Sequence, residues 1–233
     1  MKKIILSAAL LMGTGGVLLT STQSCMALAT SDLGLSVIKR VLLGGVTQMG
    51  NIFGNKQAFL QNDLIVRALP ENLRNVYNLL ERVAPNLAMR GKEYVAESAA
   101  YTVNISQPIL QNAVNSLNAN DVSRIMQGGQ GIATQVLREK TEQQLIQAIM
   151  PKVDEKLNQF GIVRSINTAL QGTNMLGTLF GGQSSSTNLG GNGLSRLASE
   201  QMVNGIFNII ADYEEKNKSS MLGAFSGSAG SMK

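Results

Sequence analysis

The side chains with which this chain could do chemistry are carboxylates, lysines, tyrosines and hydroxyls, because its 233 residues include no histidine and a single cysteine, Cys25. The lack of histidine excludes Ser-His-Asp and Cys-His machinery and imidazole ligands to a metal. Glu93 and Glu97 lie one helical turn apart and could face each other as a general acid and base. No third polar group at a fixed spacing completes such a site. Solvation, or ordinary ion pairs with Arg90 and Lys92, is the simpler interpretation.

Three further polar segments each have a structural and a functional interpretation. Residues 128–131 (Gly-Gly-Gln-Gly) precede a helix and offer backbone amides to an anion. They lack the lysine and hydroxyl of a phosphate loop, so a helix stop is the simpler explanation. Residues 138–141 (Arg-Glu-Lys-Thr) predict either a solvated helix end or a rim that contacts a partner or a lipid headgroup. Glu214 and Glu215, which precede two lysines, predict a mixed charged face at the end of a helix. We therefore expect no catalytic residue, no metal and no cofactor.

Methionines spread among aliphatic positions are the one indication of a bound apolar ligand. Such side chains fill gaps in a core or line an adaptable groove. If the protein carries a ligand, we expect an open apolar cavity between helices, where bundles commonly place such sites. Its expected lining is Met126, Ile149, Met150 and Ile206.

The first thirty residues have the three regions of an export signal. Lys2 and Lys3 precede an apolar run over residues 4–19, and small or polar residues lead to Cys25. The run is too short to span a membrane comfortably, since a bilayer core needs about twenty apolar residues, so an uncleaved membrane anchor is the lesser alternative to a cleaved signal. An exported chain works outside the cytoplasm, so the signal predicts a place of action in the cell envelope.

Two cleavage sites compete within this signal. Residues 22–25 (Thr-Gln-Ser-Cys) resemble a lipoprotein box, in which Cys25 receives a lipid and becomes the new N-terminus, although Thr22 stands where leucine is usual. The rival is an A-x-A site ending at Ala29, which would release a soluble protein that starts at Thr30. An unpaired cysteine is unusual in an exported protein, and lipidation explains its place at this junction. We therefore predict a signal peptide over residues 1–24, or 1–29 by the alternative, and Cys25 as the lipid attachment site.

The charge of the mature chain argues against a nucleic-acid partner. Loss of Lys2 and Lys3 with the signal reduces the net charge from +5 to +3. The basic residues that remain are scattered, with no run or aromatic interleaving that would suit a nucleic acid.

Composition and periodicity predict an all-α fold, a single helical domain of about seven or eight helices over residues 25–217. The first helix is expected over residues 32–43, with Gly44 and Gly45 as its stop. Residues 64–66 (Leu-Ile-Val) are the only plausible strand. A helix follows Pro70, with apolar residues at helical spacing up to Val83, and another runs from Pro85 toward Leu117. Pro108 is expected to bend or divide the second of these.

The second half of the chain holds the clearest amphipathic helix. Asn120 and Asp121 are expected to cap a short helix closed by residues 128–129, and a helix from Gly131 then reaches Thr141, which either continues it or caps the next. A stripe follows, kinked at Pro151 and ended by Gly161. Its members are Leu145, Ile149, Val153, Leu157 and Phe160. Residues 171–193 predict a flexible Gly/Ser-rich loop, residues 194–216 the last long helix, and residues 218–233 a frayed Ser/Gly-rich tail.

Several of these segments together resemble a bacterial family of exported proteins known only as domain of unknown function 4197. The residues that carry the resemblance are 67–73 (Arg-Ala-Leu-Pro-Glu-Asn-Leu), Gly128, Gly129, Ala133, Thr134, 138–141, Leu145, Pro151, Val153, 205–207 (Gly-Ile-Phe), Ile210, Ala211, Glu214 and Glu215. The resemblance implies a helical fold and an export signal, and it assigns no activity. Val136 and Leu137 stand where the family usually has an aromatic pair, and the Gly/Ser-rich loop replaces a more ordinary connection.

The absence of site chemistry favours a non-catalytic protein rather than an enzyme. We expect a lipid-tethered helical protein of the bacterial cell envelope, facing the periplasm and acting through contacts with another envelope protein. Cleavage after Ala29 would instead make it a soluble periplasmic protein. The alternative function is a carrier or sensor of an apolar ligand bound between helices.

Overall fold

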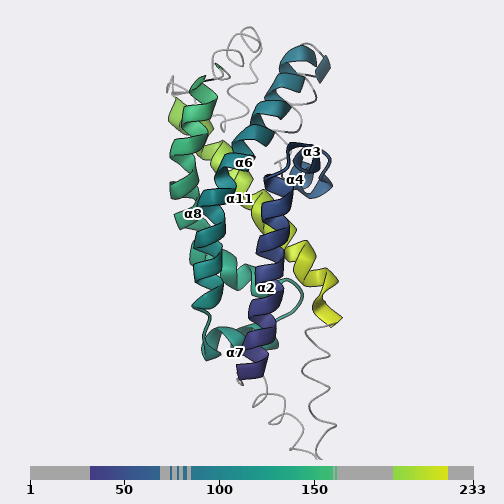
Figure 1. Cartoon of the computed structure of the whole chain (residues 1–233), viewed down its shortest axis with the longest axis vertical. Helices are drawn as coiled ribbons and strands as arrows, with labels where there is room; N and C mark the ends of the chain where they lie inside the picture. Colours follow the sequence, from purple (N-terminus) through teal and green to yellow (C-terminus); the bar gives the residue numbers. More distant parts are fainter. Residues whose placement is uncertain are drawn as a thin grey trace, which may run out of the picture.

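Four long helices stand side by side along the length of this protein (Figure 1). The computed structural model describes residues 32–68, 85–159 and 191–219, with the single positions 74, 78, 81, 82 and 161. All regular structure in these residues is helical, which confirms the all-α prediction and the single domain. The helices are α2 (Asp32–Phe53), α3 (Lys56–Leu60), α4 (Asp63–Ala68), α6 (Pro85–Asn115), α7 (Ala119–Gln127), α8 (Ile132–Gln159) and α11 (Gly191–Lys216).

The long helices form an antiparallel four-helix bundle. α2 and α8 each pack against both α6 and α11. The start of α8 meets the end of α11, where Thr134 contacts Glu214, and the opposite ends of the two helices meet at Asp154 and Ser195. α7 lies at the end of the bundle where α2 begins, and α3 and α4 lie beside the end of α2 (Figure 1). The direction of the chain thus alternates up and down through α2, α6, α8 and α11.

Apolar residues at helical spacing build the core between these helices. Leu145, Ile149, Val153 and Leu157 of α8 are all buried, which confirms the predicted stripe except for Phe160, which lies outside the described residues. Side chains three or four positions apart share one helix face, so the stripe faces the bundle axis along nearly the whole of α8. The largest side chains that are fully buried in the core are Phe53, Ile38, Leu42, Met49, Leu110, Leu137, Leu145, Ile149, Ile206, Ile209 and Ile210.

The sequence predicts that Gly44 and Gly45 stop the first helix, and this prediction is wrong. α2 continues through them to Phe53. A Cβ atom on Gly44 would lie 2.6 Å from the ring of Tyr213, and one on Gly45 would lie 3.2 Å from the Cα of Ile210. The two glycines are therefore places where α11 lies so close to the backbone of α2 that the ring of Tyr213 or the helix at Ile210 must shift to admit a larger residue.

Residues 64–66 are helical, so the predicted strand is wrong. They belong to α4, whose start is stabilised by Asn62, because the Asn62 Oδ1 accepts a hydrogen bond of 3.0 Å from the backbone amide of Leu64. Asp63 adds a negative charge to the first turn, where the helix dipole favours it. These short polar signals outweigh the preference of isoleucine and valine for strands.

The short helix α7 is capped two residues earlier than predicted. Asn118 is the cap, and its side-chain oxygen accepts hydrogen bonds from the amides of Asn120 and Asp121. The Asp121 carboxylate accepts one in return from the Asn118 amide, which completes a capping box. Val122 and Ile125 are buried, and Gly128 ends the helix as predicted.

The predicted boundaries of the longer helices are met in part. α6 begins at Pro85 as expected, and neither Pro108 in α6 nor Pro151 in α8 divides its helix. Thr141 continues α8 and bonds the carbonyl of Leu137. α11 begins at Gly191, so the last three residues of the predicted loop 171–193 are helical. The rest of that loop, the tail beyond position 219 and most of the helix expected after Pro70 lie outside the described residues.

Candidate functional site

The carboxylate of Glu214 is the most enclosed acidic group in the described residues. Glu214 is 6% exposed and lies near the end of α11, against the first turn of α8. Its Oε1 accepts a hydrogen bond of 3.1 Å from the amide of Ala133, and its Oε2 accepts one of 2.7 Å from the amide of Thr134 and one of 2.6 Å from the Thr134 hydroxyl. Three donors therefore hold this carboxylate in one position.

This carboxylate occupies the place where the glycine-containing segment before α8 could have bound an anion. The amides in the first turn of a helix have no partner within the helix and carry partial positive charge. Glu214 supplies the negative group from within the protein. A space of about 70 Å³ beside it is lined by residues 128–132, by Ile125, Met126 and Glu215, and by Lys218. The segment thus positions a helix start against α11, with Gly131 in the left-handed region at φ 74°.

Arg138 forms a second polar contact between α8 and α11. Its guanidinium carbon lies 4.8 Å from the centroid of the Phe207 ring, and its Nη2 donates a hydrogen bond of 2.8 Å to the Oδ1 of Asn204. Its Nε lies 3.7 Å from the Oε1 of Glu142, one turn further along α8, and has no hydrogen-bond partner among the described residues. Arg138 therefore packs across the helix interface and is not a solvated helix end, whereas Thr141 is buried in the core.

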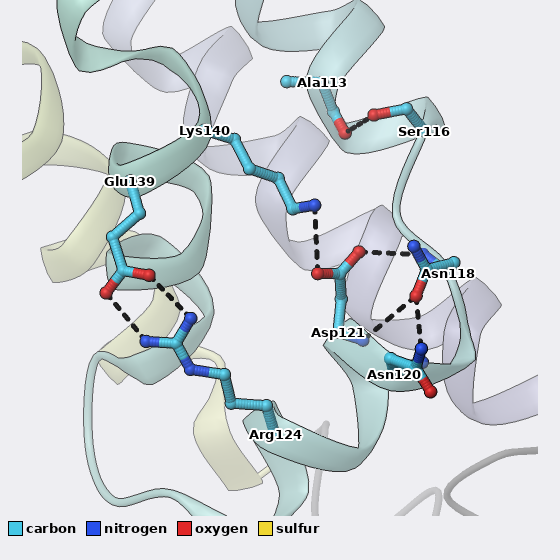
Figure 2. A network of polar contacts seen from close by, with 8 residues as sticks. All are labelled: Ala113, Ser116, Asn118, Asn120, Asp121, Arg124, Glu139 and Lys140. Atoms are coloured by element: carbon cyan, nitrogen blue, oxygen red, sulfur yellow. Dashed lines mark hydrogen bonds and ion pairs between the residues drawn. The ribbon is translucent and has the colours of Figure 1, made fainter.

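The neighbouring residues Glu139 and Lys140 tie α7 to α8 (Figure 2). The Arg124 guanidinium donates two hydrogen bonds, of 2.6 and 2.7 Å, to the two oxygens of Glu139. The Lys140 ammonium lies 3.0 Å from the Oδ1 of Asp121, the same carboxylate that completes the cap of α7. The hydrogen bond from Arg124 holds the pKa of Glu139 below its ordinary value and raises the pKa of Arg124. Within the cluster at 138–141, Arg138 therefore contacts α11, whereas Glu139 and Lys140 contact α7.

Glu93 and Glu97 are not paired with each other. The Oε1 of Glu93 lies 3.7 Å from the Nζ of Lys56 in α3, and the Oε1 of Glu97 lies 4.0 Å from the Nζ of Lys156 in α8. Each carboxylate therefore has its own cation from a different helix. The prediction that Glu93 and Glu97 form ordinary ion pairs is confirmed, but their partners are Lys56 and Lys156 and not Arg90 and Lys92.

The buried lysine and hydroxyl groups are also engaged within the fold. Lys156 is 7% exposed, and its Nζ lies 4.3 Å from the centroid of the Tyr101 ring and donates a hydrogen bond of 3.1 Å to the Oε1 of Gln159. Four buried hydroxyls donate to carbonyls three or four residues earlier in their own helices, an arrangement typical of Ser and Thr inside helices. They belong to Thr102, Ser106, Thr141 and Ser199.

The four residues expected to line an apolar cavity do not surround one. Ile149 and Ile206 have no surface that water can reach, so no space large enough for a water molecule touches either side chain. Met126 lines the small space beside Glu214, and Met150 is partly exposed on the surface. The core at these positions is closed by side chains.

The described part of the chain contains no cluster of three or more His, Cys, Asp or Glu side chains placed to hold a metal ion. No helix in the same residues is long and apolar enough to cross a membrane. Cys25 and the two predicted cleavage sites lie outside the described residues.

Sequence reasoning missed the role of Glu214. The residue sits beside Glu215 and Lys216, so the local sequence predicts a charged face. A signal was present, because Val203, Phe207, Ile210 and Glu214 follow one another at steps of four, three and four. Glu214 thus continues the buried stripe of α11, where a charged residue requires a partner. That partner is far away in the sequence.

Segments that carry the family resemblance meet in space. Thr134 contacts Glu214, and Arg138 contacts Phe207, so the start of α8 and the second half of α11 form one interface. The fold and these contacts together define an antiparallel helical bundle in which a buried carboxylate joins two helices at one end. The chain belongs to the family described as protein of unknown function (DUF4197), whose model matches residues 29–224. No curated protein and no solved structure is significantly similar to it.

Proposed function

We propose that this protein is a non-catalytic component of the bacterial cell envelope, tethered to a membrane by a lipid on Cys25 and acting through contacts with another envelope protein. The observation that carries the proposal is the engagement of its reactive groups inside the bundle. Glu214 holds the start of α8, Arg138 packs on Phe207, and Lys156 packs on Tyr101. Side chains committed to holding helices together are not free to bind and transform a substrate.

The export signal supplies the location in this proposal. Residues 1–24 direct the chain out of the cytoplasm, and the lipid on Cys25 would keep it at the membrane facing the periplasm. A short segment then separates the lipid from α2, which begins at Asp32. Cleavage after Ala29 would instead give a soluble periplasmic protein that starts at Thr30.

Intact-mass analysis of the mature protein recovered from membranes tests the tether. A mass corresponding to a diacylated or triacylated chain that begins at Cys25 supports the proposal. The matched control is Cys25→Ser, which should lose the acyl mass. A wild-type chain that begins at Thr30 and is recovered in the soluble fraction would defeat the tether.

The carrier of an apolar ligand is less well supported. Sites for small molecules usually enclose about 300–1,000 Å³. The space next to Met126 is about 70 Å³, and a larger one of about 500 Å³ beside α2 is an open surface groove lined partly by Lys39 and Arg40. Mass spectrometry under native conditions provides the test: an uncharged apolar molecule that copurifies in stoichiometric amount with the wild-type protein would favour the carrier. We expect the protein to be recovered without one.

A further inference from the structure

A shallow groove lies between the first turns of α2 and the end of α6. It encloses about 500 Å³ open to solvent and is lined by Leu35, Ser36, Lys39, Arg40, Leu43 and Asn115. Leu35, Lys39 and Leu43 are spaced at four residues, so they form one stripe along α2 with the lysine between the two leucines. Ser36 and Arg40 form the adjacent, exposed stripe. The groove therefore combines apolar and basic side chains on one helix face.

The two cations of the groove have different roles. The Nζ of Lys39 donates a hydrogen bond of 2.6 Å to the backbone carbonyl of Asn115, the last residue of α6. This contact offsets the negative end of the α6 dipole and leaves the ammonium two further donors. Arg40 has no ion pair within the described part of the chain, and no acidic side chain is among the lining residues. An anion at the groove would therefore meet donors from both residues.

The position of the groove in the chain indicates what that anion is. Cys25 precedes the start of α2 by so few residues that even a fully extended chain between them spans only about 25 Å. A lipid on Cys25 would thus keep the first turns of α2 close to the membrane surface. A short basic helix face with leucines beside its cations suits this location, because leucine enters the interface while lysine and arginine reach phosphate.

We infer that this groove binds the headgroup phosphate of an anionic phospholipid in the membrane that carries the Cys25 lipid. The inference rests on the proposed tether, since the tether places the groove at that surface. Arg40 contacts the phosphate and Lys39 adds a second donor while it holds the end of α6. Leu35 and Leu43 pack against the core and are only partly buried, so each leaves an apolar edge toward the membrane surface. The groove thereby fixes which end of the bundle faces the membrane.

Vesicle binding by the mature chain without its lipid tests the groove separately from the tether. The chain from residue 25, expressed without its signal and carrying Cys25→Ser, is mixed with vesicles of phosphatidylcholine alone or with an equal part of phosphatidylglycerol. We expect binding only to the anionic vesicles and weaker binding at high salt. Arg40→Gln should weaken that binding about fivefold, and Lys39→Gln combined with Arg40→Gln about 25-fold, since each basic residue near an anionic surface contributes a similar increment.

Arg90→Gln is the matched control, because it removes the same charge from an exposed position on the first turns of α6, away from the groove. It should leave vesicle binding unchanged, and circular dichroism should show that all variants keep the same helicity. Equal losses for Arg40→Gln and Arg90→Gln would overturn the proposal, because they would indicate binding by net charge alone. Equal binding to neutral vesicles, or none to either kind, would also overturn it.

The outcomes of the two experiments are independent. If Cys25 is acylated but the chain does not bind anionic vesicles, the proposed tether is supported and the proposed phospholipid site in the groove is wrong. A second copy of this chain is the other candidate occupant. If Arg40→Gln changed the oligomeric state in solution and left vesicle binding intact, the groove would be an interface between copies and the lipid proposal would be wrong.

Discussion

Glu214 shows how one residue can fix the end of a helical bundle. The first turn of α8 has amides without partners in its own helix, and the end of α11 has a carboxylate that is 6% exposed. Each group would be costly to bury alone. Together they satisfy each other, and the Thr134 hydroxyl adds a third hydrogen bond that only a correctly placed α8 provides. The contact therefore selects one register between α8 and α11.

Glu214→Gln should lower the free energy of unfolding by about 2 kcal/mol, because a hydrogen bond to a charged group contributes about 1.5–3 kcal/mol and the new amide cannot accept from all three donors. Urea denaturation followed by circular dichroism measures the change. Glu215→Gln is the matched control at the next, exposed position and should change the stability by less than about 0.5 kcal/mol. Similar losses from the two variants would contradict the structural role of Glu214.

Single residues also mark the limit of what the sequence predicts. The buried stripe formed by Leu145, Ile149, Val153 and Leu157 could be predicted from local spacing, because all four residues belong to one helix. The role of Glu214 depends on Ala133 and Thr134, which belong to another helix and are brought near by the bundle. Local spacing predicts that a face is buried, but it does not predict which distant group satisfies a charge on that face.

At the scale of elements, the glycines of α2 illustrate the same limit. A pair of glycines after an apolar helix typically indicates a stop, yet here Gly45 lies against Ile210 in the middle of a continuous helix. Whether a glycine ends a helix or admits a neighbour depends on what lies opposite. The predicted strand at 64–66 failed for a related reason, because the Asn62 cap and the packing of α4 against α11 outweigh the preference of its residues.

Gly45→Leu should destabilise the protein by about 1–3 kcal/mol or more, because the added side chain would force α2 and α11 apart. Gly91→Leu in α6 is the matched control, since a Cβ there meets nothing within 4 Å. The control should be neutral or stabilising by up to about 1 kcal/mol, because leucine favours helix more than glycine does. Thermal unfolding of both variants measures the difference. If both substitutions destabilised the protein, or both stabilised it, the close approach of α2 and α11 would be contradicted.

The ion pair between α7 and α8 should make stability depend on acid pH. Arg124 holds the pKa of Glu139 below the ordinary value of 4.5, so the folded state favours the ionised carboxylate more than the unfolded state does. This contribution is present above the unfolded pKa and is lost as the pH falls through the folded one. Glu139→Gln should therefore lose less stability than wild type between neutral pH and a pH below 4.5. Denaturation at the two pH values measures this.

A second substitution checks the origin of that effect. Adding Arg124→Gln to Glu139→Gln should produce no further change in pH dependence, because the carboxylate whose titration is altered is already absent. A further change would mean that Arg124 acts through another acidic group, and Asp121 on its own helix is the candidate, since it also interacts electrostatically with Arg124.

At the scale of the whole molecule, the packing of the core bears on the carrier, the alternative function. Side chains such as Ile149 and Ile206 have no surface open to water, in agreement with the close packing of protein interiors. The all-α class and the single domain were predictable because nearly every segment has helical spacing. The antiparallel order of α2, α6, α8 and α11 was not predicted, since it depends on which faces meet.

Ile206→Ala should lower the stability by about 2–5 kcal/mol and leave an apolar cavity that small apolar molecules can enter. Benzene should therefore raise the melting temperature of the variant and leave that of wild type unchanged. Val95→Ala, at a position that is 41% exposed, is the control and should show neither effect. A wild-type protein stabilised by benzene to the same extent would indicate an internal cavity and would favour the carrier.

The pairing of α2 with α11 has a consequence for how the chain acquires its structure. α6 and α8 each pack against the next long helix along the chain, but α2 also packs against α11, the last of the four long helices in chain order. Until α11 arrives, the face of α2 around Gly45 remains uncovered, and late contacts of this kind slow folding and leave apolar surface open to aggregation. A chain that folds after export would emerge with α2 first. In such a chain that face of α2 would stay uncovered until α11 follows it and the bundle closes.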